Sequence, residues 1–271
     1  VSDNRDGSLN AEAKVTNSEG EDVKLGEIQF VNKYEATGSL TLEGTKVLNG
    51  RKLEAEQFTF ALSEGKEVLQ TVANAEDGSF KFAPIEYTTA NIGIHTYTVQ
   101  EVTPAADGNG YTYDRAIYTV VVKVSDNGDG TLNVDVRKEN DKEPELKFTN
   151  TYKAEGKTSV TATKVLTGTT LTENNKFSFT LESTGIAPAY KETVQNGLDG
   201  SISFPEMTYT EADAGQTYTY LMYEEIPAEK AAGYTYDETV YHVEVTVTDN
   251  GDGNLEAKPK IYEISGPAGR P

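Results

Sequence analysis

Residues 110–124 read GYTYDRAIYTVVVKV, and residues 233–247 repeat the pattern as GYTYDETVYHVEVTV. In each copy a tyrosine is followed by valines at every second position, which places apolar side chains on one face of an extended chain. Such alternation predicts a half-buried β-strand. Because the second copy begins 123 residues after the first, the two stretches also indicate a long internal repeat.

Four further pairs of segments repeat with a similar spacing. They are VSDNGDG at 124–130 with VTDNGDG at 247–253 (and a related VSDNRDG at 1–7), TKVLNG at 45–50 with TKVLTG at 163–168, QFTFAL at 57–62 with KFSFTL at 176–181, and DGSFKF at 77–82 with DGSISF at 199–204. A step of about 120 residues is far longer than the unit of a solenoid, so we expect each copy to be a domain.

The composition and the turns favour an all-β fold. The chain contains 16 Tyr and 9 Phe with many Val and Thr, which prefer strands. The DNGDG segments lie between apolar runs and supply the positive-φ residues that a hairpin needs. About seven strands per module is typical of a β-sandwich. Helix is limited to at most one turn, at residues 53–58 and in the region 211–216.

The repeat divides the chain into one complete module and two partial ones. Residues 34–151 are expected to form the complete module. Residues 1–33 match the last hairpin and last strand of a preceding module. Residues 152–271 match a module without its last strand, because the final ISGPAGRP does not resemble such a strand.

The bulk composition argues against several classes of partner and chemistry. The formal charge of −20 argues against nucleic acid and anionic membranes, and it fits a solvated surface. The absence of cysteine excludes disulfides, a thiol nucleophile and a zinc–thiolate site. No apolar run approaches the roughly 20 residues of a membrane span. No signal peptide or sorting motif is present, so we expect an interior piece of a longer protein.

Each module places polar residues on apolar strand faces. In LTLEGTKVLNG, residues 40–50, Lys46 shares a face with leucines. Glu101 and Asn150 likewise alternate with apolar residues in HTYTVQE and PELKFTN. The C-terminal module repeats the pattern at Lys164 and Glu224, and the N-terminal segment repeats it at Asn32.

Each of these polar residues, taken alone, has an ordinary structural explanation, but no single one of these explanations covers all three. An inward lysine can snorkel at a strand end, and an inward Asn or Glu can be a satisfied polar group at the rim. A Lys–Glu ion pair explains two of the residues and leaves the asparagine unexplained.

Covalent chemistry accounts for all three residue types. In an apolar setting the lysine and the glutamate can both be neutral, and a neutral amine is a nucleophile. The amine attacks the side-chain amide carbon of the asparagine. A protonated glutamate, hydrogen-bonded to the amide oxygen, relays a proton to the leaving ammonia. The expected product is an isopeptide bond between the first and last strands.

The motifs T-K-V-L-x-G, then V-Q-E or M-Y-E, then F-T-N or F-V-N resemble the streptococcal pilin isopeptide-linkage repeat. That group belongs with the collagen-adhesin B-type domains of Gram-positive surface proteins. The resemblance implies tandem immunoglobulin-like β-sandwiches in an extracellular, cell-wall-attached protein, with spontaneous Lys–Asn bonds assisted by Glu. It implies neither a cofactor nor an enzyme acting on external substrates.

Carried over by residue, the resemblance assigns the cross-link to Lys46 and Asn150 with Glu101 as the catalytic acid. Lys164 and Glu224 match a module that has no F-x-N, and Asn32 matches an acceptor whose lysine is not in this chain. A strand from residues 1–33 of one molecule could therefore complement the 152–271 module of another copy. The alternative is an accidental boundary with a frayed edge.

Two function classes remain open. The first is a structural stalk repeat of a cell-surface adhesin or pilus, whose partners are the neighbouring modules. The second is an adhesive module that binds a host matrix protein or glycan through its loops. Near-identical repeats favour the stalk.

Other signals carry no functional assignment. DNGDG lacks the spacing of a calcium loop, so a hairpin is the better interpretation. His95 and His242 are not assigned to catalysis or metal binding, since no nucleophile or acid is arranged around either in the sequence. No residue pair among the 44 acidic residues is singled out for glycoside hydrolysis.

Overall fold

The computed structural model describes residues 1–24, 26, 28–137, 145–185 and 189–264. Regular structure in these residues is almost entirely β-strand, with short turns of 3-10 helix at Thr89–Asn91 and Glu211–Asp213, so the predicted all-β class is confirmed. The second of these turns lies where the sequence allowed one, whereas residues 53–58 form a non-helical turn. The tail 265–271, which was not expected to form a strand, lies outside the described residues.

Packing divides the chain into two compact units, which are described separately. The first comprises Val1–Leu40, Ile85–Ile94 and Lys123–Asp135, and the second comprises Thr41–Pro84, His95–Val122 and Val136–Pro271. The module boundaries expected from the repeat, at residues 33/34 and 151/152, remain a prediction.

The first unit contains small antiparallel ribbons. Their pairs are β1 (Ser2–Asp3) with β2 (Leu9–Asn10), β3 (Val15–Thr16) with β4 (Asp22–Val23), and β5 (Thr37–Leu40) with β10 (Ile85–Thr88). The first pair encloses the DNRDG segment, which confirms the hairpin expected there. Arg5 (φ 60°) and Gly7 (φ 90°) adopt the left-handed backbone that this turn requires.

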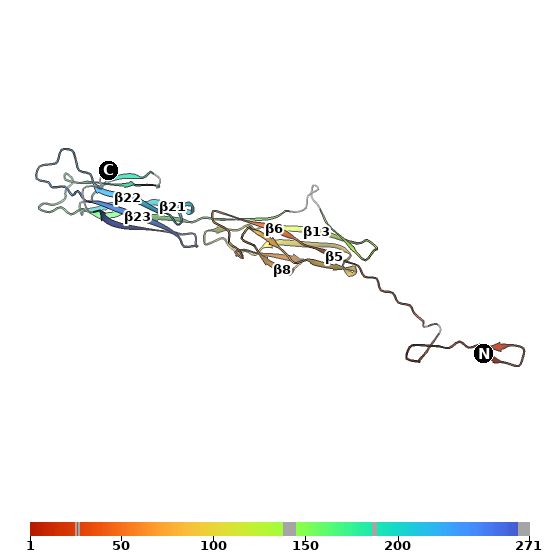
Figure 1. The fold of residues 1–271 in the computed structure, drawn as a ribbon. Helices are drawn as coiled ribbons and strands as arrows, with labels where there is room; N and C mark the ends of the chain where they lie inside the picture. The colour runs from red at the N-terminus through yellow and green to blue at the C-terminus, as the bar shows by residue number, and fades with distance from the viewer. Residues whose placement is uncertain (25, 27, 138–144, 186–188, 265–271) are drawn as a thin grey trace. The chain divides into compact units, whose positions relative to one another are not determined.

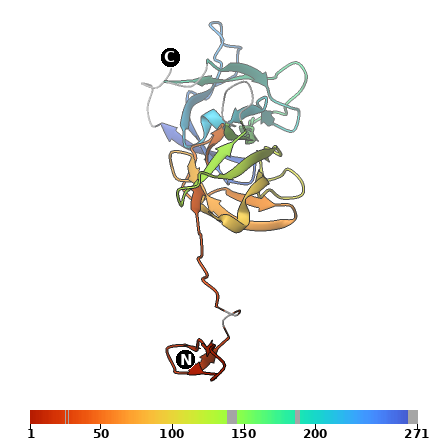
Figure 2. The ribbon, with the colours of Figure 1, turned by 90° about the vertical axis from the view of Figure 1, so that its right-hand side faces the viewer.

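Residues 28–34, IQFVNKY, form no strand, although the repeat predicts a last strand there. The side chains of Phe30 and Val31 are among the most exposed of the large apolar residues, at 95% and 84%. Figure 2 shows this part of the chain as coil beyond the red N-terminal hairpin. An apolar strand sequence is thus present here without a sheet to bury it.

Two sheets enclose the core of the middle module, which is the complete module expected at residues 34–151. Their strand orders are β12-β15-β6-β9 and β14-β13-β11-β7-β8. The bounds are β6 Glu43–Asn49, β7 Thr59–Glu64, β8 Glu67–Ala73, β9 Ser79–Lys81, β11 Gly93–Glu101, β12 Tyr111–Thr112, β13 Ile117–Asp126, β14 Leu132–Val136 and β15 Leu146–Tyr152. Phe60 of one sheet and Phe148 of the other are fully buried, with ring centroids 5.1 Å apart. This arrangement confirms the expected immunoglobulin-like sandwich.

The last strand of this module lies directly beside β6. β15 pairs with β6 in parallel, with Phe148 opposite Lys46 and Asn150 opposite Leu48. Every second residue of β15, from Leu146 to Tyr152, is buried. The predicted inward face of this strand is therefore confirmed, and its pairing brings the acceptor strand next to the lysine strand.

The C-terminal module repeats most of this plan. Its large sheet has the order β19-β18-β22-β23-β24, and two-stranded sheets pair β16 with β21 and β17 with β20. The bounds are β16 Glu155–Thr158, β17 Thr161–Thr163, β18 Ser178–Ser183, β19 Lys191–Gln195, β20 Ser201–Ser203, β21 Met207–Thr210, β22 Thr217–Glu224, β23 Val240–Asp249 and β24 Leu255–Ile264. Figure 1 shows β22 and β23 side by side. Within the described residues β17 pairs only with β20, whereas its counterpart β6 pairs with both β9 and β15.

Candidate functional site

The sandwich brings together the three polar residues predicted for the middle module. β6 carries Lys46, β11 carries Glu101 and β15 carries Asn150. The lysine and glutamate side chains are completely buried, and Asn150 has no exposed surface. Because β6 and β15 belong to one sheet and β11 to the other, the site bridges the two layers of the sandwich.

Glu101 connects the two nitrogen atoms of the site. Lys46 Nζ donates a hydrogen bond to Glu101 Oε2, and Asn150 Nδ2 donates to Glu101 Oε1 over 2.6 Å. The glutamate was expected on the amide oxygen of the asparagine, and that detail is wrong. The amide oxygen, Oδ1, instead accepts from the backbone N–H of Asp114 at 2.7 Å.

The backbone donor also fixes the orientation of the asparagine amide. A flipped amide would point its NH2 group at the Asp114 N–H, which can only donate, and its oxygen at Glu101 Oε1. Both contacts would then be lost. Asp114 was not singled out as a site residue from the sequence, although the recurrence of GYTYD at 110–114 and 233–237 marked its loop.

Burial controls the electrostatics of Lys46. Its Nζ lies 4.4 Å from the centroid of the Phe58 ring and has lost its water. Burial lowers the pKa of Lys46 from its ordinary value of 10.5, while the hydrogen bond and the charge of Glu101 oppose the shift. A lowered pKa increases the fraction of neutral amine, which is the nucleophilic form.

The C-terminal module contains two of the three groups in the same arrangement. Lys164 Nζ donates to Glu224 Oε2 over 2.6 Å and lies 4.3 Å from the centroid of the Phe177 ring. The other carboxylate oxygen, Glu224 Oε1, is buried and has no hydrogen-bond partner among the described residues. Its counterpart in the middle module is the oxygen that accepts from Asn150. A buried oxygen without a hydrogen-bond partner raises the free energy of the folded state, so a donor bound at this position would stabilise the module.

A cavity adjoins this unpartnered oxygen. It has a volume of about 230 Å³, and Lys164 and Glu224 lie in its wall. In the middle module Phe148 fills the corresponding region, packing against Phe60, Phe80 and Tyr118 at centroid distances of 5.1, 6.0 and 5.1 Å. The residues that match these three in the repeat also line the cavity, and they are Phe179, Ile202 and Tyr241.

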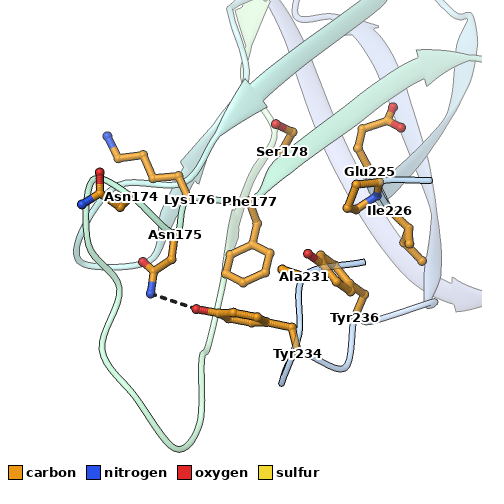
Figure 3. Close-up of a pocket in the computed structure, with 11 residues that line it drawn as sticks. Asn174, Asn175, Lys176, Phe177, Ser178, Glu225, Ile226, Ala231, Tyr234 and Tyr236 are labelled. Atoms are coloured by element: carbon orange, nitrogen blue, oxygen red, sulfur yellow. Dashed lines mark hydrogen bonds between the residues drawn. The ribbon is translucent and has the colours of Figure 1, made fainter. Parts of the chain in front are cut away.

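A second cavity of about 430 Å³ lies beside Phe177, Tyr234 and Tyr236. Figure 3 shows Phe177 facing the two tyrosine rings, with Asn175 Nδ2 donating to the Tyr234 hydroxyl over 3.5 Å. In the middle module the counterpart of Tyr234 is Tyr111, which pairs with Tyr152 at the end of β15. The first cavity therefore matches a place that the last strand fills in the middle module, and the second lies beside the counterpart of a residue that pairs with that strand.

The remaining predicted residues lie elsewhere. Asn32, the candidate acceptor near the N-terminus, is exposed in the coil of residues 28–34. His95 lies 2.9 Å from Glu64, and His242 lies 3.9 Å from Glu244. In the described part of the chain no group of three or more His, Cys, Asp or Glu residues is arranged to hold a metal ion. No described helix is long and apolar enough to cross a membrane.

Comparison with known proteins places the chain in a family. The model of the family "FctA: Spy0128-like isopeptide containing domain" matches residues 42–153 and again residues 160–268. A search of curated proteins found no match.

Among solved structures, the chain is similar to the major pilin protein T-13 of Streptococcus pyogenes, with 19% identity, 86% of this chain and 98% of that chain covered, and a TM-score of 0.32. It is also similar to a mutant of the major pilin of the same species (16% identity, 84% and 91% covered, TM-score 0.31) and to BcpA, the major pilin subunit of Bacillus cereus (14% identity, 84% and 69% covered, TM-score 0.28). The two matches of the family model cover most of the sequence. The chain therefore belongs to the family of Spy0128-like isopeptide-containing domains, which are structural rather than catalytic modules, and carries two copies in tandem.

Proposed function

We propose that this chain is part of the stalk of a pilus or adhesin on the surface of a Gram-positive bacterium, and that an isopeptide bond joins Lys46 to Asn150. The observation that carries the proposal is the buried glutamate, whose two oxygens contact the lysine amine and the asparagine amide nitrogen. Membership of an isopeptide-containing family supports it. The protein is then an extracellular structural element, and the bond forms once per module.

The reaction balances with the groups present. A proton moves from Lys46 Nζ to Glu101, which leaves a neutral amine and a neutral carboxylic acid. The amine lone pair attacks Asn150 Cγ, and a negative charge develops on Oδ1. The attacking nitrogen then gives a second proton to the carboxyl group, which gives one to Nδ2. The Cγ–Nδ2 bond breaks, ammonia leaves, and the glutamate ends as a neutral acid.

The bond would strengthen the module between β6 and β15. The chain between Lys46 and Asn150 becomes a closed loop of about 104 residues, and by analogy with disulfides such closure stabilises by about 5 kcal/mol through the unfolded state. Tension that enters at one end of the module and leaves at the other would pass through the covalent tie instead of the hydrogen bonds of the sheet.

An intact-mass measurement tests this proposal. One bond releases one ammonia, so the wild-type monomer should be about 17 Da lighter than its sequence mass. Lys46→Ala and Asn150→Ala should each show the full mass of their own sequence. Lys52→Ala is a matched control, because Lys52 is exposed and pairs with Glu76, and it should keep the loss. A wild-type monomer at full mass would contradict the proposal.

The same chemistry extends to the C-terminal module through a strand of another copy. The coil IQFVNKY at 28–34 matches the buried strand LKFTNTY at 146–152 residue by residue. In that register Phe30 would fill the 230 Å³ cavity, and Asn32 Nδ2 would donate to Glu224 Oε1. Exposed apolar side chains in the coil and an unpartnered oxygen beside an apolar cavity support the pairing. Lys164 would then attack Asn32 of the other molecule.

Denaturing gels test strand complementation. After long incubation at high concentration, covalent dimers and larger species should accumulate in the wild type. They should be absent in Lys164→Ala and in Asn32→Ala. Lys157→Ala, which removes an exposed lysine near Glu206, should retain them. Monomers alone under these conditions would count against joining in trans, while leaving the bond of the middle module untouched.

A further inference from the structure

We infer that Asp114 guides the cross-linking reaction in two ways. Its backbone N–H stabilises the negative charge that develops on Asn150 Oδ1, and its carboxylate positions the acceptor strand for the attack. The inference rests on the proposed bond between Lys46 and Asn150, and it adds a residue that neither the apolar pattern nor the Lys–Glu–Asn set contains.

The first part follows from the contact on the amide oxygen. The Asp114 N–H donates to Asn150 Oδ1 over 2.7 Å. This distance is within the range found between hydrogen-bond donors and the oxyanions that they stabilise. When the lysine nitrogen attacks Cγ, the electrons of the C=O bond move onto this oxygen. A donor held in place before the reaction stabilises that charge without reorganising, and here it acts in a site that excludes water.

The second part follows from the carboxylate of the same residue. Asp114 Oδ2 accepts from the backbone N–H of Thr149 over 2.8 Å, and Oδ1 accepts from the N–H of Ala116 over 2.9 Å. The contact with Ala116 closes a local turn that fixes the loop. The contact with Thr149 reaches the residue before the acceptor. One residue therefore holds two successive positions of β15, through its carboxylate and through its backbone.

The C-terminal module has the same turn, with no counterpart of β15 beside it in the part of the chain that the structure describes. Asp237 is the counterpart of Asp114 in the second GYTYD, and Thr239 N–H donates to Asp237 Oδ1 over 2.9 Å. Both residues line the 230 Å³ cavity beside Lys164 and Glu224. The turn is therefore present in the described residues without a bound acceptor strand. It is a preformed part of the site and not a consequence of the strand.

Asp114 could instead affect the reaction only through its negative charge, which acts on Lys46. Its negative charge favours the protonated form of Lys46 and so opposes the lowering of the lysine pKa by burial. If charge were the only role, Asp114→Asn would increase the neutral amine and speed the reaction. If the carboxylate positions the strand, the same variant slows the reaction, because an amide offers one acceptor where two N–H groups must be satisfied.

The experiment follows the kinetics of ammonia loss. Full-length chain is synthesised, kept unfolded in denaturant, and diluted into buffer, and the loss of 17 Da is followed by mass spectrometry over a range of pH. We expect Asp114→Asn and Asp114→Ala to react at least about tenfold more slowly than wild type at every pH. Asp129→Asn, which alters the same kind of turn in the 126–130 hairpin, should react at the wild-type rate.

A core variant separates positioning from loss of stability. Val122→Ala removes buried methyl groups from β13, a strand that carries none of the reacting residues, and it should lower the melting temperature while reacting at the wild-type rate. Wild-type rates in both Asp114 variants, or an equal slowing in Val122→Ala at matched stability, would overturn the inference. Absence of mass loss in the wild type would instead overturn the proposed function itself.

Discussion

At the scale of single residues, the site depends on one carboxyl group that serves two nitrogen atoms. Glu101 accepts from Lys46 with one oxygen and from Asn150 with the other. A buried ion pair alone is a weak stabiliser. In the proposed reaction the same contacts would carry protons from the attacking nitrogen to the leaving nitrogen, which would explain why a glutamate and not an apolar residue occupies this position.

Glu101→Gln should abolish the bond in the middle module. A glutamine has one acceptor oxygen and a nitrogen that cannot accept, so it cannot take a proton from Lys46 and return one to Asn150. The mass of the purified variant should show no loss of ammonia. Glu76→Gln is the control, since Glu76 is an exposed residue that pairs with Lys52. Loss of 17 Da in Glu101→Gln at the wild-type rate would refute the role of the glutamate.

The lowered pKa of Lys46 sets the pH dependence of the reaction. The nucleophile is the neutral amine, and in the proposed reaction its proton is held by Glu101. Because burial lowers the pKa of Lys46, the pair loses this proton to solvent below pH 10.5, the ordinary value, so the rate should be level near neutral pH and fall before pH 10.5 is reached. Refolding kinetics by mass spectrometry measure the profile. A rate that has not fallen by pH 10.5 would show that the amine is not desolvated.

In the middle module, the alternation of residues along strands was sufficient to predict the inward position of the three site residues, whereas the same pattern at Asn32 lies in exposed coil. Lys46, Glu101 and Asn150 are buried as expected. Alternation could not predict which atom of the asparagine faces the glutamate. That choice is set by the N–H of Asp114, which lies in a loop where no periodicity applies.

At the scale of elements, the DNGDG hairpins have a role that the sequence did not reveal. Tyr152 donates to Asp249 over 2.7 Å and accepts from the N–H of Gly253 over 3.3 Å. In the first unit, Tyr34 makes the equivalent bonds to Asp126 and to the N–H of Gly130, at 2.9 and 3.1 Å. Each hairpin thus binds a tyrosine, and this agrees with the interpretation of DNGDG as a turn rather than a calcium loop.

The sequence contained both halves of this contact but not their pairing. Each tyrosine lies two residues after a candidate acceptor, Asn32 or Asn150. The hairpins follow about a hundred residues later, and local patterns carry no information on contacts at that separation. The parallel pairing of β6 with β15 was hidden for the same reason.

Tyr152→Phe should destabilise the C-terminal module by about 1–3 kcal/mol, because the variant leaves Asp249 and the Gly253 N–H without their shared partner. Burial and the bond to Asp249 raise the pKa of Tyr152 to about 12, so its hydroxyl stays protonated at neutral pH. Chemical denaturation measures the change. Tyr262→Phe, whose hydroxyl contacts Glu244 at the surface, is the control and should change stability little. Equal effects of the two substitutions would exclude a special role for the hairpin contact.

At the scale of the whole molecule, the repeat predicted tandem sandwiches, and the family matches agree with two successive copies. That the C-terminal module lacks its last strand stays a prediction, made from the absence of an F-x-N motif in residues 152–271. The cavity and the Glu224 oxygen that has no partner among the described residues could not be predicted, because they depend on how strands from distant parts of the chain pack around them.

Stretching single molecules should show the mechanical effect of the bond. The segment between Lys46 and Asn150 cannot extend if its ends are joined, so unfolding of the middle module should release about 350 Å less chain than in Lys46→Ala. Force spectroscopy measures this length directly. Equal extensions in the wild type and the variant would mean that no covalent bond holds the segment between Lys46 and Asn150 closed under tension.

The central claim is that the lysine and the asparagine are covalently joined, and peptide mapping tests it most directly. The wild-type protein is digested with a protease, and the fragments are sequenced by tandem mass spectrometry. We expect a branched peptide in which Lys46 and Asn150 are linked and one ammonia is missing. Two separate linear peptides, each with an unmodified Lys46 or Asn150, would contradict the account.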